Sequence, residues 1–278
     1  MKFRIGHSPD ADDAFMFYAL ANNLIDTGDY EIEHVMVDIE SLNRRALDGE
    51  LEMTAISVHA LPYVADKYAL TPCGASIGDN YGPVIVAAKP LEEKDLKGKT
   101  IAVPGALTTA YLAARLYQPD FQEMLVPFDK IIDIVKAGEA DAGLIIHEGQ
   151  LTYSDEGLHK VVDLGTWWFD KTGGLPLPLG CNVVRKDLGE KVMRESTRIF
   201  KKAIEFALSH REEALQYAMK FARGMVNPQQ ADKFVGMYVN DYTLDFGVKG
   251  QKAVNELLSQ GFERGIIRQE PTIAFVSI

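Results

Sequence analysis

The sequence predicts an α/β protein with two lobes and a ligand cleft between them. A chain of 278 residues with 47% hydrophobic residues can bury a large core and is long enough for about two domains. Strands alternate with helices over two separate stretches, which is typical of a parallel sheet covered by helices. Two extended or charged segments between these stretches are candidate crossovers from one lobe to the other.

The first stretch begins at the N-terminus, where short apolar runs predict three strands over 3–6, 31–37 and 52–57. A helix is predicted after each strand. The first begins with acidic residues at Asp12 and Asp13, where a helix favours negative charge. The second covers Leu42 to Leu47 with Ser41 as its N-cap. The third runs from about residue 59 to residue 66.

The second stretch follows an apolar strand over 84–88 and a charged surface turn over 89–99, which is the first candidate crossover. Strands are predicted over 101–103, 124–127 and 142–146, with helices over 109–117 and 130–137. The extended, turn-rich segment 173–180 leads into a strand over 181–185 and is the second candidate crossover. We therefore predict residues 1–86 and 186–278 in the first lobe and residues 87–185 in the second.

The C-terminal third of the chain is predicted to be helical. Apolar and small residues recur at spacings of four and three, as on one side of an amphipathic helix: Val192, Ser196, Ile199, Ala203 and Phe206. Further helices are expected over about 211–222, 228–240 and 248–261. We expect these helices to pack on the first lobe.

Composition excludes several classes of protein. The chain has 29 Lys+Arg against 40 Asp+Glu and a net charge of −11, which argues against a nucleic-acid partner. It has no run of about 18 apolar residues and no signal-like N-terminus, so we expect no membrane contact and a cytoplasmic location. Cys73 and Cys181 suit neither a zinc site nor a disulfide framework and are expected to be reduced, buried thiols. The expected partner is a small molecule, and the sequence does not indicate the oligomeric state.

Ligands bind beyond the carboxyl ends of the strands in an open α/β sheet. The residues at these places are mostly small or polar: Ser8, Pro9, Asp10, Ser41, Asn43, Ile56, Ser57, His59, Gly105, Thr108, Thr109, His147 and Glu148.

Three of these places, after Ser8, Ser57 and Thr108, are predicted helix N-termini, where free N–H groups favour an anion. A carboxylate could be held there without lysine or arginine, although ordinary N-capping explains the same residues. Gly105 would let the chain approach a ligand closely, but the surrounding segment has no nucleotide-binding glycine pattern. Asp10 and its acidic neighbours are better explained as helix-start acids than as a metal site.

His147 is the sharpest catalytic candidate because it ends an apolar strand and because histidine, as a residue type, can take a proton near neutral pH. The alternative is a hydrogen-bonded histidine at a strand edge. A pairing of Ser8 or Ser57 with His147 is disfavoured as a serine hydrolase, because the sequence has no Gly-x-Ser-x-Gly elbow. The aromatic residues Trp167 and Trp168 could wall the cleft or pack between the lobes.

Several motifs together resemble the 1,4-dihydroxy-6-naphthoate synthases of the futalosine route to menaquinone. They cover nearly the whole chain, in order and with compatible spacing: Ser8-Pro-Asp-x-Asp-Asp-x-Phe-Met-Phe-Tyr-Ala-Leu, Ser41-Leu-Asn-Arg, Val103-Pro-Gly-x-x-Thr-Thr-Ala-Tyr, Ala142-Gly-Leu-Ile-Ile-His-Glu and Gly174-Leu-Pro-Leu-Pro-Leu-Gly. The resemblance implies a two-lobe architecture similar to type 2 periplasmic binding proteins. It also implies a carbon–carbon lyase that converts cyclic dehypoxanthinyl futalosine, a carboxylate-bearing bicycle, into 1,4-dihydroxy-6-naphthoate.

The same resemblance implies roles for individual residues. His147 would act as proton acceptor and start the loss of the sugar-derived fragment, so that the remaining rings become aromatic without a cofactor or metal. Substrate contacts carry over onto Ala55, Ile56 and Ser57 in one lobe and Thr108 and Thr109 in the other. To these we add Asn43 as a ring or hydroxyl contact, and Ser8 with Asp10 as residues that shape the first-lobe side.

Two alternatives remain open at this point. Chorismate dehydratase of the same pathway is also two-lobed and also acts on a carboxylate. A non-catalytic carboxylate-binding protein would share the fold, although that class normally carries an export signal.

Overall fold

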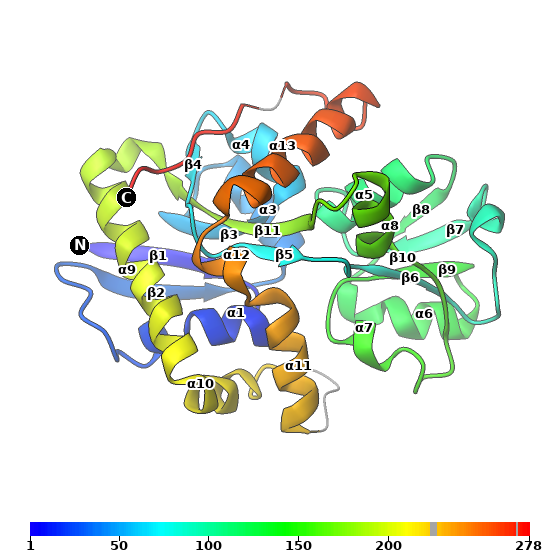
Figure 1. Ribbon diagram of the computed structural model, residues 1–278, viewed down its shortest axis with the longest axis horizontal. Helices are drawn as coiled ribbons and strands as arrows, with labels where there is room; N and C mark the ends of the chain where they lie inside the picture. Colours follow the sequence, from blue (N-terminus) through cyan, green and yellow to red (C-terminus); the bar gives the residue numbers. More distant parts are fainter. Residues whose placement is uncertain (223–226, 271) are drawn as a thin grey trace.

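The computed structural model describes residues 1–222, 227–270 and 272–278. Two sheets lie side by side, each covered by helices (Figure 1). The six-stranded sheet has the order β2-β1-β3-β11-β4, with β5 also paired to β11, and defines the first lobe. The five-stranded sheet has the order β10-β6-β9-β7-β8 and defines the second lobe. The predicted two-lobe α/β fold is confirmed.

The first sheet combines three parallel strands with strands that return from later in the chain. β1 (Lys2–His7), β2 (Glu31–Met36) and β3 (Met53–Ser57) match the predicted strands to within about two residues at each end. The long strand β11 (Leu177–Arg185) runs antiparallel to β3, β4 (Tyr68–Leu70) and β5 (Ser76–Gly78). Since β11 begins four residues before the predicted strand, much of the turn-rich segment before residue 181 is itself sheet.

The helices of the first lobe differ from prediction in their starts and lengths. The first predicted helix divides into α1 (Ala11–Met16) and α2 (Tyr18–Ala21). The helix α3 (Ile39–Leu47) begins earlier than predicted, and its N-cap is Asp38. The Asp38 carboxylate accepts hydrogen bonds from both the backbone N–H and the hydroxyl of Ser41, so Ser41 as N-cap was wrong. The third predicted helix is two short turns, η1 (Val58–Ala60) and α4 (Leu61–Val64).

The second sheet contains the other predicted strands and the strand β10, which was not predicted. The helix α8 (Leu164–Lys171) of the same lobe was not predicted either. The strands are β6 (Val84–Ala87), β7 (Thr100–Val103), β8 (Gln122–Leu125), β9 (Ala142–Ile145) and β10 (His159–Asp163). Among the helices, α5 (Thr109–Tyr117) has the predicted bounds, and α6 (Ile131–Ala137) starts one residue late.

The two crossovers lie earlier in the chain than the sequence suggested. β6 belongs to the second sheet, so the predicted boundary after residue 86 falls inside a strand. β11 belongs to the first sheet, although the prediction gave residues up to 185 to the second lobe. The charged turn over 89–99 connects two strands of the second sheet through η2 (Glu93–Leu96). A short apolar strand buried on both faces carries no signal of which sheet it joins.

The C-terminal helices cover the first lobe, as predicted (Figure 1). They are α9 (Glu190–Ser209), α10 (Arg211–Ala218), α11 (Pro228–Tyr238), α12 (Asp241–Leu244) and α13 (Gly247–Glu263). The end of the helix predicted over 211–222 adjoins residues 223–226, which lie outside the described residues. Nowhere in the described ranges is a helix both long and apolar enough to cross a membrane.

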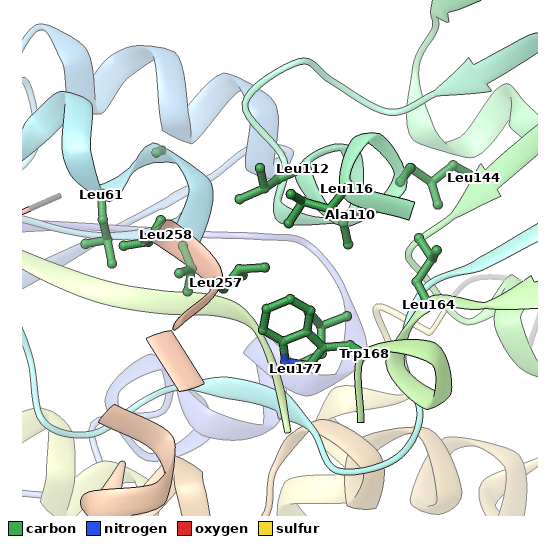
Figure 2. Packing of buried hydrophobic residues seen from close by; sticks show 14 of the residues in the cluster. Leu61, Ala110, Leu112, Leu116, Leu144, Leu164, Trp168, Leu177, Leu257 and Leu258 are labelled. Carbon is green, nitrogen blue, oxygen red and sulfur yellow. The ribbon is translucent and has the colours of Figure 1, made fainter. Parts of the chain in front are cut away.

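One apolar core continues from the first lobe into the second (Figure 2). Leu61, Leu257 and Leu258 from the first lobe share it with Leu112 and Trp168 from the second. Trp168 is fully buried, and its Nε1–H donates to the carbonyl of Pro176 at 3.1 Å. Trp168 therefore packs in the core, and it does not wall the cavity described below. The helix α5 thus rests on an apolar base that both lobes supply.

Candidate functional site

A cavity lies where the carboxyl ends of strands from both sheets meet. It is lined by residues after β1, in β3, at the start of α5 and after β9, as the strand-end rule predicts. Further lining residues come from β5, β11 and α11. The members with polar side chains are Ser8, Asp10, Asp12, Asp13, Ser57, Ser76, Thr108, Thr109, Cys181, Asn182 and Tyr238. The described residues that form this lining include no lysine or arginine.

The β3 side of the cavity is formed by three of the predicted contacts, Ala55, Ile56 and Ser57. Ser57 is held from behind by Asn43, which is fully buried on α3. The Asn43 amide Nδ2–H donates to Ser57 Oγ at 3.0 Å, and its Oδ1 accepts the Ser57 backbone N–H at 2.7 Å. The structure thus places Asn43 behind the lining, where it fixes Ser57, and not in the lining itself.

The second-lobe side of the cavity is the N-terminus of α5. Thr108 is the N-cap, because its hydroxyl oxygen accepts the backbone N–H of Tyr111 at 3.2 Å. Thr109 Oγ1 donates to the carbonyl of Leu179 at 2.6 Å and accepts the backbone N–H of His59 at 3.1 Å. These bonds join the two lobes beside the cavity. The first turn of a helix carries N–H groups without helical partners, and such a turn favours an anion.

Gly105 has a different role from the one expected. A Cβ atom at Gly105 would lie 2.4 Å from Glu40 Oε2, so the missing side chain makes room for Glu40 of the first lobe. The same carboxylate oxygen accepts the backbone N–H of Leu107 at 3.1 Å. Gly105 therefore permits a close contact between the lobes, and it is not among the residues that line the cavity.

His147 lies at the edge of the site. Its neighbour Ile146 lines the cavity, whereas His147, which lies in the bend after β9, is not among the lining residues. The imidazole lies 5.5 Å from the ring of Phe128, measured between centroids, and the side chain is 14% exposed. His147 Nδ1 accepts the backbone N–H of Gly149 at 3.0 Å, which assigns the neutral ring's proton to Nε2.

An acidic cluster forms part of the lining on the first-lobe side. Asp10, Asp12 and Asp13 each place an oxygen within 4.8 Å of the others, and Asp13 Oδ2 accepts the Ser8 backbone N–H at 2.6 Å. Burial raises the pKa of Asp12 and of Asp13 well above the usual range, and the charge of Asp10 adds to both shifts. Asp12 and Asp13 lie in the first turn of α1, as predicted, but they also line the cavity.

Sequence reasoning missed the lining residues from β5, β11 and α11. Among them Tyr238 is notable, because its hydroxyl donates to Gln150 Oε1 at 2.7 Å. Gln150 belongs to α7 (Gly149–Thr152), the turn that follows His147. This buried bond ties the His147 segment of the second lobe to α11 of the first. Nothing in the local sequence around Tyr238 indicates the contact, because it depends on how the C-terminal helices fold back.

The raised pKa of Asp12 predicts how stability depends on pH. The folded state holds the Asp12 proton more tightly than the unfolded chain, so stability is lost as pH rises above about 3.8. Asp12→Asn is therefore expected to raise the melting temperature at pH 7, by roughly 2–4 °C for each kcal/mol gained. The gain should shrink toward pH 4. Thermal unfolding between pH 4 and 8 measures this difference.

The matched control for this change is Asp133→Asn, because Asp133 is an exposed acid on α6. The melting temperature of this variant should equal that of the parent protein at each pH. A gain from Asp12→Asn that is the same at pH 4 and at pH 7 would contradict the assignment, because it would not come from ionisation.

Comparison with known proteins identifies the family. A family model described as menaquinone biosynthesis matches residues 3–263. The chain belongs to this family. Among members of the family, a 1,4-dihydroxy-6-naphthoate synthase of Thermus thermophilus is 41% identical, covering 98% of each chain. A protein of the same name from Streptomyces coelicolor is 36% identical, covering 95% of this chain and 94% of its own. The resemblance inferred from the motifs is confirmed.

Solved structures agree with the fold. A crystal structure of a protein from Archaeoglobus fulgidus is 48% identical, covers 96% of this chain and 98% of its own, and has a TM-score of 0.91. A Candida albicans protein with the generic periplasmic binding protein fold has a TM-score of 0.72 at 13% identity, covering 100% of this chain and 98% of its own. The predicted periplasmic-binding-protein-like architecture is confirmed.

Proposed function

We propose that the protein is a carbon–carbon lyase that converts cyclic dehypoxanthinyl futalosine into 1,4-dihydroxy-6-naphthoate in menaquinone biosynthesis. The observation that carries this proposal is its family membership, with relatives of that name matching along nearly their whole length. The cavity between the lobes supports it, because the Ser57 hydroxyl and the N-terminus of α5 provide donors for a carboxylate.

The substrate carboxylate would bind where Ser57 faces the N-terminus of α5, with Thr108 and Thr109 on the second-lobe side. Two lobes that hold the ligand between them exclude water and fix its orientation, which lowers the barrier before any proton moves. The backbone N–H groups of α5 would compensate the negative charge locally, where the acidic lining cannot.

His147 would remove the proton that starts the loss of the sugar-derived fragment, and the gain of aromaticity in the remaining rings would drive the reaction forward. The lone pair of the neutral imidazole lies on Nδ1, which the Gly149 N–H occupies. Proton acceptance therefore requires this turn to open when substrate binds. Catalytic hydrogen bonds commonly reach their working geometry only in the complex.

The experiment is to incubate the protein with cyclic dehypoxanthinyl futalosine and to follow 1,4-dihydroxy-6-naphthoate by absorbance and mass. Formation of this product supports the proposal. Turnover of chorismate instead would identify the protein as a chorismate dehydratase. Binding of small carboxylates without turnover of either compound would identify a binding protein, which the fold also permits.

We also propose a cytoplasmic location for this activity. Cys73 and Cys181 are both buried and unpaired, which suits a reducing compartment.

A further inference from the structure

One buried amide oxygen in the cavity wall accepts no hydrogen bond within the described part of the chain. Asn182 on β11 is 1% exposed, and its Nδ2–H donates to the carbonyl of Gly74 at 2.9 Å, which fixes the orientation of the amide. Its Oδ1 is left without a donor. A buried acceptor without a partner is costly, so its presence in a ligand cavity points to a donor that the ligand brings.

Other residues of this part of the lining also carry oxygen atoms. Gly74, which holds the Asn182 amide, lies two residues before Ser76, and Ser76 Oγ donates to Asp12 Oδ2 at 3.4 Å. Asp12, Ser76, Gly74 and Asn182 all line the cavity. Together they form a wall of the cavity that carries the acceptor oxygens of Asn182 and Asp12, and the charge of Asp10 beside Asp12 makes this wall unfavourable for a carboxylate.

The strand β11 runs from this wall to the place proposed for the carboxylate. At Leu179 the strand accepts the Thr109 hydroxyl next to the N-terminus of α5. Three residues further along, Asn182 contacts Gly74. In the register of β11 with β3, Gly180 lies opposite Ser57 and Asn182 lies opposite Ala55, so Asn182 is two residues of strand, roughly 7 Å, from the position opposite Ser57. The cavity therefore has a donor-rich side at α5 and an acceptor-rich side at Asn182.

We propose that Asn182 and Asp12 bind hydroxyl groups of the sugar-derived part of the substrate and thereby set its orientation. The substrate identity rests on the function proposed above. Each hydroxyl donates a hydrogen bond to Asn182 Oδ1 or to an Asp12 oxygen. The acidic cluster repels the carboxylate, which therefore binds on the α5 side. A site built from buried polar groups discriminates strongly against ligands that lack the matching donor.

The test compares two ligands that differ in this part. The substrate carries the sugar-derived fragment, whereas the product 1,4-dihydroxy-6-naphthoate has lost it and keeps the carboxylate. For Asn182→Ala and Asp12→Ala, KM for the substrate is expected to rise about five- to tenfold, the effect of one lost hydrogen bond. The Kd of the product should stay within about twofold, since it lacks the hydroxyl groups of the sugar-derived fragment. Ser57→Ala, on the carboxylate side, should weaken both ligands.

Asp133→Asn, the exposed control, should change neither constant. Unchanged KM in both cavity variants would overturn the proposal, as would an equal loss of substrate and product affinity, because that pattern indicates a general distortion of the site. Should Asn182→Ala fail to fold, Asp12→Ala decides alone. Turnover by the parent is measured first. Its absence would refute the proposed function and this inference with it, whereas parent turnover with unaffected variants refutes this inference only.

Discussion

His147→Ala is expected to lower kcat for 1,4-dihydroxy-6-naphthoate formation by roughly 10²–10⁴-fold, the usual contribution of a positioned general base. The Kd of the product should change little, because the His147 side chain is not among those lining the cavity. Product formation under saturating substrate measures the first quantity, and titration with the naphthoate measures the second. Far-ultraviolet circular dichroism and thermal unfolding show whether the variant is folded.

The matched control is His159→Ala, which removes an exposed histidine on β10 of the same lobe. Its kcat should remain that of the parent. A folded His147→Ala protein that keeps more than about a tenth of the parent kcat would show that another group takes the proton. Since Gly149 N–H occupies Nδ1, such a result would direct attention to the acids of the cavity wall.

Trp168→Ala is expected to lower the free energy of unfolding by about 3–5 kcal/mol, the cost of removing a fully buried large aromatic side chain. Trp168 is fully buried in the core that both lobes share. Its removal would also leave the Pro176 carbonyl without the indole N–H as donor. Equilibrium unfolding in urea measures the loss. Because one core serves both lobes, we expect a single transition in the parent protein.

Trp167→Ala is the matched control, one residue away on α8 and only partly buried, with its ring edge-to-face against Tyr117. It should lose less than half as much stability. Equal losses in the two variants would contradict the packing described here. Two separate transitions in the parent would show that the lobes unfold independently despite the shared apolar contacts.

The sequence alone located much of the cavity lining, because the place where parallel strands end is set by the topology of the sheet. Ser8, Ser57 and Thr108 follow or end predicted strands, and the parallel arrangement brings them to one cavity. The helix α5 was predicted with its correct bounds because a capping threonine precedes an apolar helical run. Helix bounds of this kind can be predicted from the sequence because they depend on residues within one turn of each other.

The features that the sequence did not reveal depend on contacts between distant segments. Asn182 and Tyr238 reach the cavity on a return strand and on a C-terminal helix, and neither position has a local motif. Asn43 and His147 were placed in the site by strand and helix ends, but the direction of each side chain depends on the backbone. One residue of register decides whether a strand-end side chain enters a cavity or turns away.

The absence of lysine and arginine from the described cavity lining has a consequence for how an anionic ligand arrives. With a net charge of −11, the protein's long-range field repels a carboxylate, whereas the N–H groups of α5 attract it only at contact. Mobile ions screen the long-range repulsion beyond a Debye length of about 10 Å at 0.1 M salt. They leave the short-range attraction by the N–H groups of α5 largely unchanged. Higher ionic strength therefore speeds encounter with such a ligand, the reverse of the behaviour of enzymes that steer substrates with opposite charge.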